Sequence, residues 1–188
     1  MAKGSKGFSS RARGETAQPG PLENPLDMIA EDHMREREVC ALIDRLVIAS
    51  PIKDAERRMM LAFLKVQLSQ HLADEEIDLF PLMVKRCDPE EEIIKVITKL
   101  KSDHVHALAD GPAIAALIEA NDPKAAFSET ACAEMTAFAN HSRRHLILEN
   151  AIILPLARAY LTKKDLKTMR AHMQKRRGLD RGGDPKTC

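Results

Sequence analysis

The sequence is poor in aromatic residues, and this shortage narrows the folds open to it. Tryptophan is absent, and the one tyrosine and five phenylalanines amount to 3% of the chain. Leu, Ile, Ala and Met supply most of the apolar residues, a mixture that favours helices over strands. The chain also lacks an apolar run of the roughly 18 residues that a membrane-spanning helix requires. We therefore expect no contact with a membrane.

Paired cysteines and a secretory signal are also missing. The four cysteines are scattered and form no Cys-x-x-Cys pair, which favours reduced, mostly structural thiols over a disulfide framework. Residues 1–22 are rich in Gly, Ser, Arg and Lys and contain no apolar signal-peptide core. We interpret them as a flexible basic arm and expect a cytoplasmic protein.

The net charge of +1 conceals two basic ends on an acidic body. Residues 1–22 carry four Lys or Arg against one Glu, and residues 163–188 carry nine against three Asp, so the ends contribute +3 and +6. The remainder of the chain is therefore −8. Solvated tails are the favoured interpretation, with a protein partner for the C-terminal tail as the alternative. Nucleic-acid binding is disfavoured, because no recognition motif or interleaved aromatic residues accompany the basic ones.

Apolar residues recur at helical spacing in four long segments separated by turn signals. The segments run from Asn24-Pro25 to Ser50-Pro51, from about Lys53 to Arg86, from Asp88-Pro89 to about Ala120, and from about Ser128 to Ala159. A capping-box pattern at residues 162–165 predicts a shorter fifth helix that ends near Gly178. Gly111-Pro112 is expected to kink or restart the third helix.

Short turns between long helices place consecutive helices antiparallel. The sequence therefore predicts an all-α protein: an up-and-down antiparallel four-helix bundle with a short fifth C-terminal helix and a flexible N-terminal arm. The helical domain is expected over residues 23–177, followed by a flexible tail over residues 178–188.

Two of the long segments carry a histidine followed four residues later by a glutamate, His71 with Glu75 and His145 with Glu149. At about 100° per residue, both side chains of each pair lie on one helix face. The pairs belong to an internal repeat, HLADEEIDLFP (71–81) and HLILENAIILP (145–155), offset by 74 residues. This repeat predicts a quasi-two-fold site.

The other two long segments carry Asp-His pairs at His33 and His104. Counted from the turns that join the helices, all four histidines fall at one level to within about one helical turn. Four imidazoles and two carboxylates in one layer could hold two metal ions, with the carboxylates placed to bridge them. The aspartates before His33 and His104 would then support the ligands from behind.

The order His, His-x-x-x-Glu, His, His-x-x-x-Glu resembles the hemerythrin-like (HHE cation-binding) domain, and so do the trailing sequences EEIDLFP and ENAIILP. The resemblance covers about residues 24–177. It implies a four-helix bundle with two non-haem iron ions, bridged by carboxylates and by an oxo or hydroxo group. The ligands that it implies are His33, His71, Glu75, His104, His145 and Glu149. Imidazole and carboxylate also suit zinc, copper and manganese, so iron follows from the resemblance alone.

The histidine spacing in the third segment differs from that of the oxygen-carrying members of that family, which have a His-x-x-x-His pair on the third helix. Here the third segment offers His104 and His106, only two residues apart. The fourth segment instead offers His141, four residues before His145 and on the same face. His141 is a candidate fifth histidine ligand, or else a polar residue behind the ligands or at the end of the pocket. His106 and His172 are interpreted as surface residues.

Six protein ligands do not fill the coordination of two iron ions, so positions on the ions stay open to a small molecule. We therefore expect a protein that binds or reacts with O₂, peroxide or nitric oxide, in oxidative or nitrosative stress or in sensing. Catalase-like turnover fits this expectation, but the sequence does not decide whether the protein is an enzyme. One alternative is a metal-responsive regulatory module whose basic tail engages a partner through Lys175, Arg176, Arg177 and Arg181. An iron storage or donor protein is the other.

Overall fold

The computed structural model describes residues 24–48, 52–88 and 92–179, and this part of the chain is helical and contains no strand. The all-α prediction is confirmed for these residues. The predicted basic arm (1–22) and nearly all of the predicted tail (178–188) lie outside them. No described helix has the length and apolarity needed to cross a bilayer.

The helices follow the predicted segments closely. The first segment is α1 (Pro25–Ile48) and the third is α5 (Ile93–Ala120). The second is continuous through α2 (Asp54–Ala62), η1 (Phe63–Gln67), α3 (Leu68–Ala73), η2 (Asp74–Leu79) and α4 (Phe80–Arg86), where η marks a π-helical turn. The fourth runs through α6 (Glu129–Leu148), η4 (Glu149–Ile153) and α7 (Leu154–Tyr160), and α8 (Lys163–Arg176) is the short fifth helix.

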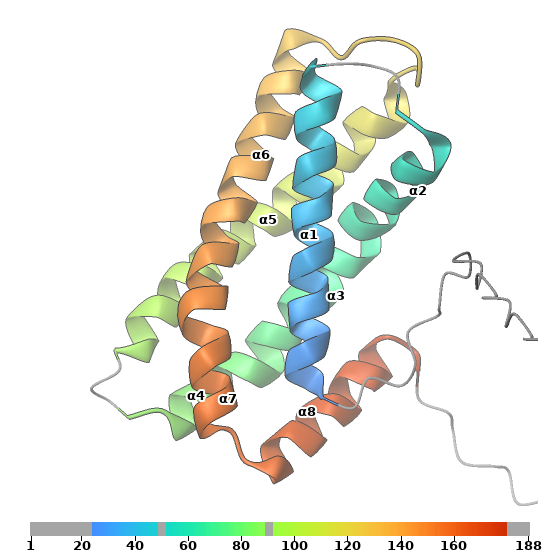
Figure 1. Ribbon diagram of the computed structural model, residues 1–188. Helices are drawn as coiled ribbons and strands as arrows, with labels where there is room; N and C mark the ends of the chain where they lie inside the picture. Colours follow the sequence, from blue (N-terminus) through green and yellow to red (C-terminus); the bar gives the residue numbers. More distant parts are fainter. Residues whose placement is uncertain (1–23, 49–51, 89–91, 180–188) are drawn as a thin grey trace, which may run out of the picture.

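The four long segments lie lengthwise beside one another, and α8 crosses one end of them (Figure 1). α1 packs against α6, and α6 packs against α5. α8 contacts the first part of α1 and the π turn η2. This arrangement is consistent with the bundle that the family resemblance implies.

Side-chain caps fix several helix ends where the sequence predicts them. The Ser128 hydroxyl accepts a hydrogen bond from the Ala131 amide (3.2 Å) at the start of α6. Thr162 and Asp165 form the predicted capping box at the start of α8. Asn24 Oδ1 accepts from the Leu26 amide (3.0 Å) at the start of α1. Such caps satisfy amides that have no partner within the helix.

The predicted restart of the third helix at Gly111-Pro112 is wrong, because α5 continues through both residues; the alternative, a kink at this point, stays a prediction. Gly111 has a packing role instead. A Cβ at this position would lie 2.9 Å from Leu68 Cδ2 and 3.4 Å from the Leu64 carbonyl oxygen. A side chain here would therefore require the end of Leu68 to shift, whereas a glycine leaves this contact undisturbed.

Two π turns, η2 and η4, fall at matching positions of the sequence repeat. The Phe80 amide bonds the Glu75 carbonyl and the Leu154 amide bonds the Glu149 carbonyl, each five residues back. A proline follows each turn, Pro81 and Pro155. Proline has no amide hydrogen and crowds the carbonyl four residues earlier, and the wider π turn accommodates this crowding without breaking the helix. Such turns are frequent at functional sites.

Two apolar clusters fill the interior, one toward each end of the molecule. The α2-end cluster contains Val39, Cys40, Ile43, Leu64, Leu68, Leu72, Met135, Phe138 and Ala139, among others. The α8-end cluster contains Ile29, Leu79, Phe80, Leu100, Ile153, Met169 and Met173, among others. Between them lies a layer of buried polar residues. Polar groups are costly inside a protein, so this layer requires a separate explanation.

Candidate metal centre

The six residues that the resemblance implies as ligands all lie in the buried layer between the two clusters. His33 projects from α1, His71 and Glu75 from the second segment, His104 from α5, and His145 and Glu149 from the fourth. Each is at most 4% exposed. The four helical segments thus bring together residues that are far apart in the sequence.

The donor atoms fall into two groups that share both glutamates. His33 and His71 join Glu75 and Glu149 in one group, and His104 and His145 join the same two glutamates in the other. Within each group, one ligand atom from every residue lies within 4.8 Å of the others. The predicted quasi-two-fold arrangement is therefore visible in the geometry.

The short contacts run from each glutamate to histidines of both groups. Glu149 Oε2 lies 3.2 Å from His33 Nε2, and Glu149 Oε1 lies 2.9 Å from His145 Nε2. Glu75 Oε1 lies 3.6 Å from His33 Nε2, and Glu75 Oε2 lies 3.4 Å from His104 Nε2. Each carboxylate therefore stands between the two histidine pairs, where a bridging ligand would stand.

These donor atoms fit metal ions chemically. The Nε2 atoms of all four histidines and all four oxygens of Glu75 and Glu149 are buried and lack a well-formed hydrogen bond. Buried polar groups in proteins are nearly always satisfied. Ions coordinated by imidazole nitrogen and carboxylate oxygen would satisfy all eight atoms at once.

Without metal, the site is a cluster of ion pairs. Burial lowers the pKa of His33 and His104, but pairing with Glu149 and Glu75 outweighs burial and raises each pKa to about 10. Burial also raises the pKa of Glu149, yet its close pairing with His104, His145 and His33 holds that pKa well below the usual value. Metal ligation must displace the protons on the imidazoles.

Carboxylates stand behind three of the four histidines. Asp32 Oδ2 lies 3.9 Å from His71 Nδ1, and Asp103 Oδ2 lies 3.9 Å from His145 Nδ1. The Nδ1 of His104 donates to Glu76 Oε1 (2.8 Å). With a metal ion bound, this bond would keep the proton of His104 on Nδ1 and leave Nε2 to the ion. The sequence indicates the two aspartates but not Glu76.

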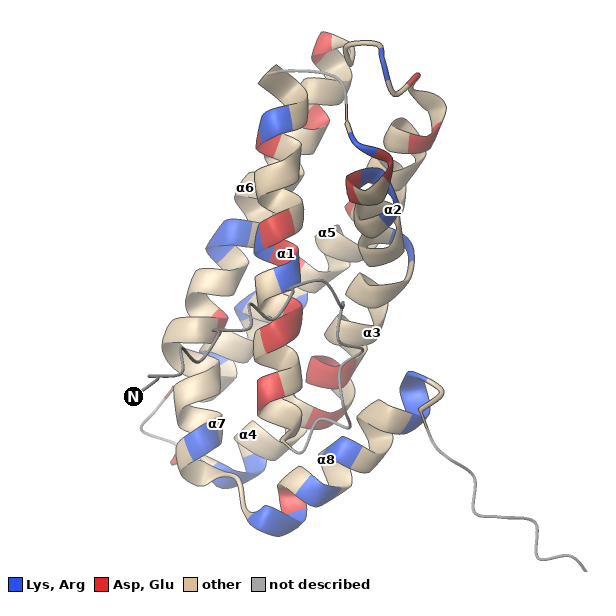
Figure 2. Ribbon diagram, turned by 45° about the vertical axis from the view of Figure 1, so that its right-hand side comes forward, with Lys and Arg blue, Asp and Glu red and all other residues tan. Residues whose placement is uncertain are grey.

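The C-terminal helix α8 closes one side of the site through two arginines. Arg176 bonds Asp74 and, at 2.8 Å, Asp78 Oδ2. Arg177 bonds Asp74 and, at 2.8 Å, Asp32 Oδ2. Figure 2 shows Lys and Arg spaced along α8, next to the acidic parts of α1 and of the second segment. The sequence analysis assigned these arginines to a basic tail that could bind a protein partner. It did not predict their contacts with aspartates of the same chain.

His141 lies outside both donor groups. Its Nε2 is 3.7 Å from Asp103 Oδ1, and its side chain is 27% exposed. It lines a surface pocket of about 380 Å³ together with Lys99, Asp103, Arg144, Ile147 and Leu148. Its role as a fifth ligand stays a prediction. His106 and His172 are exposed, as expected, and His172 Nδ1 bonds Asp78 Oδ1 (2.6 Å).

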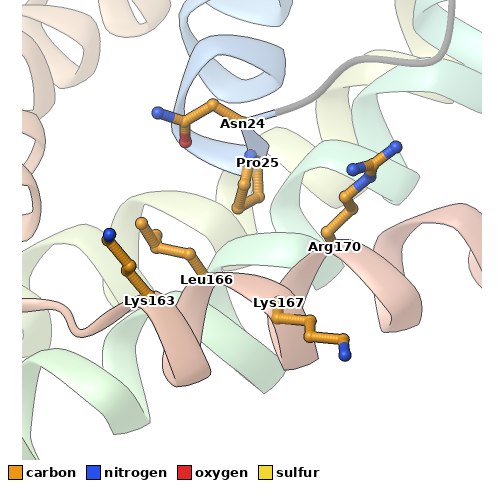
Figure 3. A pocket seen from close by; sticks show the side chains of 6 residues that line it. All are labelled: Asn24, Pro25, Lys163, Leu166, Lys167 and Arg170. Atoms are coloured by element: carbon orange, nitrogen blue, oxygen red, sulfur yellow. The ribbon is translucent and has the colours of Figure 1, made fainter.

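A second pocket, of about 290 Å³, lies between the start of α1 and α8. Its side chains do not converge on one point: Leu166 extends toward the side chain of Lys163, whereas Lys167 points away (Figure 3). None of its lining residues belongs to the two donor groups. This pocket is therefore separate from the candidate metal centre.

The fold and the site together define an all-helical protein with two buried sets of metal donors. The model of the hemerythrin HHE cation binding domain matches residues 24–157. The chain therefore belongs to the hemerythrin HHE cation-binding family, and the resemblance noted in the sequence is confirmed. A search of curated proteins found no match to the chain.

Proposed function

We propose that this protein holds two iron ions and uses them to bind or react with a small ligand, O₂, peroxide or nitric oxide. One observation supports the proposal most directly: the two donor groups share Glu75 and Glu149. A pair of isolated mononuclear sites would need no shared carboxylates. Iron is preferred over zinc because structural zinc sites are usually mononuclear and rich in cysteine.

The protein's own residues would hold and orient the ions. His33 and His71 would bind one ion and His104 and His145 the other, with Glu75 and Glu149 bridging them. This set leaves positions open at each ion, since six protein ligands are fewer than two octahedral ions require. The iron pair would supply reversible electron transfer to a small ligand.

Around the ions, the two apolar clusters would restrict entry of water. Asp32, Asp103 and Glu76 would orient the imidazoles from behind, and such partners affect metal affinity about 10–100-fold in other proteins. The up-and-down order of the four long segments and a cytoplasmic location are parts of the same proposal.

Metal content and an optical spectrum test this function. The full chain would be purified under air, assayed for iron and then reduced without oxygen. Two irons per chain, with near-ultraviolet bands that disappear on reduction, are expected. O₂, peroxide or nitric oxide would then be added to the reduced sample to identify the ligand. A single zinc with a featureless spectrum would exclude the proposal.

A regulatory function with a protein partner is the second candidate, and the contacts of α8 bear on it. Arg176 and Arg177 already bond carboxylates beside the metal donors. A partner that used these arginines would have to displace Asp74, next to Glu75. Such competition would couple partner binding to the metal centre.

A further inference from the structure

Glu36 is a buried carboxyl group that the ligand set does not use. It lies on α1, one helical turn after His33, and is 3% exposed. Ser142 of α6 is near the Glu36 carboxyl, and the Oε2 atom of Glu36 has no hydrogen-bond partner. Sequence reasoning missed this residue, because Glu36 belongs to neither copy of the His-x-x-x-Glu repeat.

Glu36 faces the metal donors from the side opposite to Glu75 and Glu149. In the second and fourth segments the chain passes from His71 and His145 through Glu75 and Glu149 to Leu79 and Ile153 of the α8-end cluster. On α1 the chain passes from His33 through Glu36 to Val39 and Cys40 of the α2-end cluster. The bridging carboxylates thus occupy one side of the histidine layer, and Glu36 occupies the other.

The positions left open by the bridging carboxylates would face this second side. Glu36 is near enough to the centre to interact electrostatically with His71, Glu149 and His145. Its unpartnered oxygen therefore lies on the side of the histidine layer where a small ligand between the ions and the α2-end cluster would bind.

The environment of Glu36 is unfavourable for a carboxyl group. Burial raises its pKa above the ordinary value, and a buried polar oxygen without a partner destabilises a fold. Buried carboxyl groups beside a cluster of ligands are candidates for functional roles. A hydrogen bond to a bound ligand would offset this cost.

We propose that Glu36 determines specificity at the metal centre by hydrogen-bonding a ligand that carries a proton, such as hydrogen peroxide. Nitric oxide has no proton to donate and would gain little from this contact. This inference rests on the proposed function and names the class of ligand that the centre favours.

The test compares Glu36→Leu with Glu36→Gln in the full chain after loading with iron. Leu removes the hydrogen bond and Gln preserves one, so Leu should slow the reaction with peroxide about tenfold, the value of one net hydrogen bond. Gln should stay within about threefold of the original protein. Nitric oxide affinity should change less than about twofold in both variants, since this ligand gains little from the bond.

A measurement without metal provides an independent readout. Because Leu removes a buried, incompletely paired carboxyl group, the metal-free Glu36→Leu variant should melt about 2–4 °C higher than the original chain. Glu38→Gln, an exposed change two residues away on α1, is the matched control and should alter none of these values.

The possible failures are distinguishable. If neither the original chain nor any variant binds iron, the proposed function and this inference both fail. If the iron-loaded chain binds nitric oxide but Glu36→Leu reacts with peroxide at the original rate, the inference alone fails. A Glu36→Gln variant as slow as Glu36→Leu would also overturn it, because hydrogen bonding would then not be the role of Glu36.

Discussion

The two halves of the candidate centre share their donor geometry but differ in what surrounds it. The first half comes from α1 and the second segment, and the other half comes from α5 and the fourth segment. In both, an aspartate lies 3.9 Å behind the histidine of the His-x-x-x-Glu pair, Asp32 behind His71 and Asp103 behind His145. In both, a π turn begins at or beside the glutamate.

Two of the positions at which the copies of the repeat differ change the surroundings of the donors. Asp74 and Asp78 in the first copy correspond to Leu148 and Ile152 in the second. The two aspartates bind Arg176 and Arg177 of α8, whereas the two apolar residues pack against the α8-end cluster. Leu148 also lines the surface pocket beside Asp103 and His141.

A duplicated ligand set therefore does not imply a duplicated environment. The carboxylates at positions 74 and 78 help to bind α8 over the first half, together with the apolar contacts of Met169 and Met173 in the α8-end cluster. Without such carboxylates, the second half borders a pocket that opens to solvent. The second half is accordingly the expected route by which a small ligand reaches the ions.

The largest effect is expected at the two glutamates that both halves share. Glu75→Ala and Glu149→Ala should each reduce bound metal from two ions to at most one, because each glutamate belongs to both donor groups. Loss of a direct ligand should exceed the about 10–100-fold reduction in affinity known for supporting residues. Metal analysis after dialysis measures the effect.

Exposed Glu134→Ala on α6 is the control and should retain both ions. If Glu75→Ala lost only the ion of the first half and Glu149→Ala only that of the second, the shared-bridge arrangement would be wrong.

The next largest effect, on stability, should differ between the two halves. Replacing both Arg176 and Arg177 with Ala should lower the free energy of unfolding of the metal-free protein by about 3–5 kcal/mol. The reason is that Asp74, which is 0% exposed, would lose both cations. Urea unfolding at neutral pH measures the change.

The matched change in the second half is Lys99→Ala with Arg144→Ala. Lys99 pairs with the buried Asp103 but has a side chain that is 60% exposed, and pairs screened by solvent contribute about 0–1 kcal/mol. Equal losses in the two double variants would contradict the asymmetry between the halves.

Proton competition should weaken metal binding in both halves alike. The pKa of His33 in the first half and of His104 in the second is about 10 without metal, and ligation needs neutral imidazoles. The apparent affinity for cobalt(II), used as an optical probe, should therefore rise between pH 7 and pH 8 by about tenfold for each proton released. Competition with a chelator measures it.

The stability of the metal-free protein should show the opposite trend. A histidine pKa raised from 6.5 to about 10 stabilises the folded chain fully below pH 6.5, and this contribution is lost as the pH rises through about 10. A cobalt affinity that is constant across this range would mean that these histidines are not protonated before they bind metal.

The sequence predicts the six candidate donor residues and the aspartates behind them, but not the other contacts that surround the donor layer. His71 with Glu75 and His145 with Glu149 are recognisable because one helix face determines their spacing. Glu76 and Glu36 escape prediction, because their contacts, with His104 of α5 and Ser142 of α6, depend on packing between segments. The π turns also escape prediction, since hydrophobic periodicity does not distinguish one extra residue in a turn.

The smallest expected effect concerns His141, which has no histidine counterpart in the first half. At the matching position of the repeat, the first half has Gln67 in place of His141. His141 lies outside both donor groups, and its nearest charged neighbour is Asp103 at 3.7 Å. His141→Gln makes the halves alike here and should leave two ions bound, with an affinity change below about tenfold, under the range for closely supporting residues. Metal content and the optical spectrum of the iron-loaded variant measure how many ions remain bound. Loss of one ion would instead make His141 a fifth histidine ligand, and the two ions would then differ in coordination as well as in surroundings.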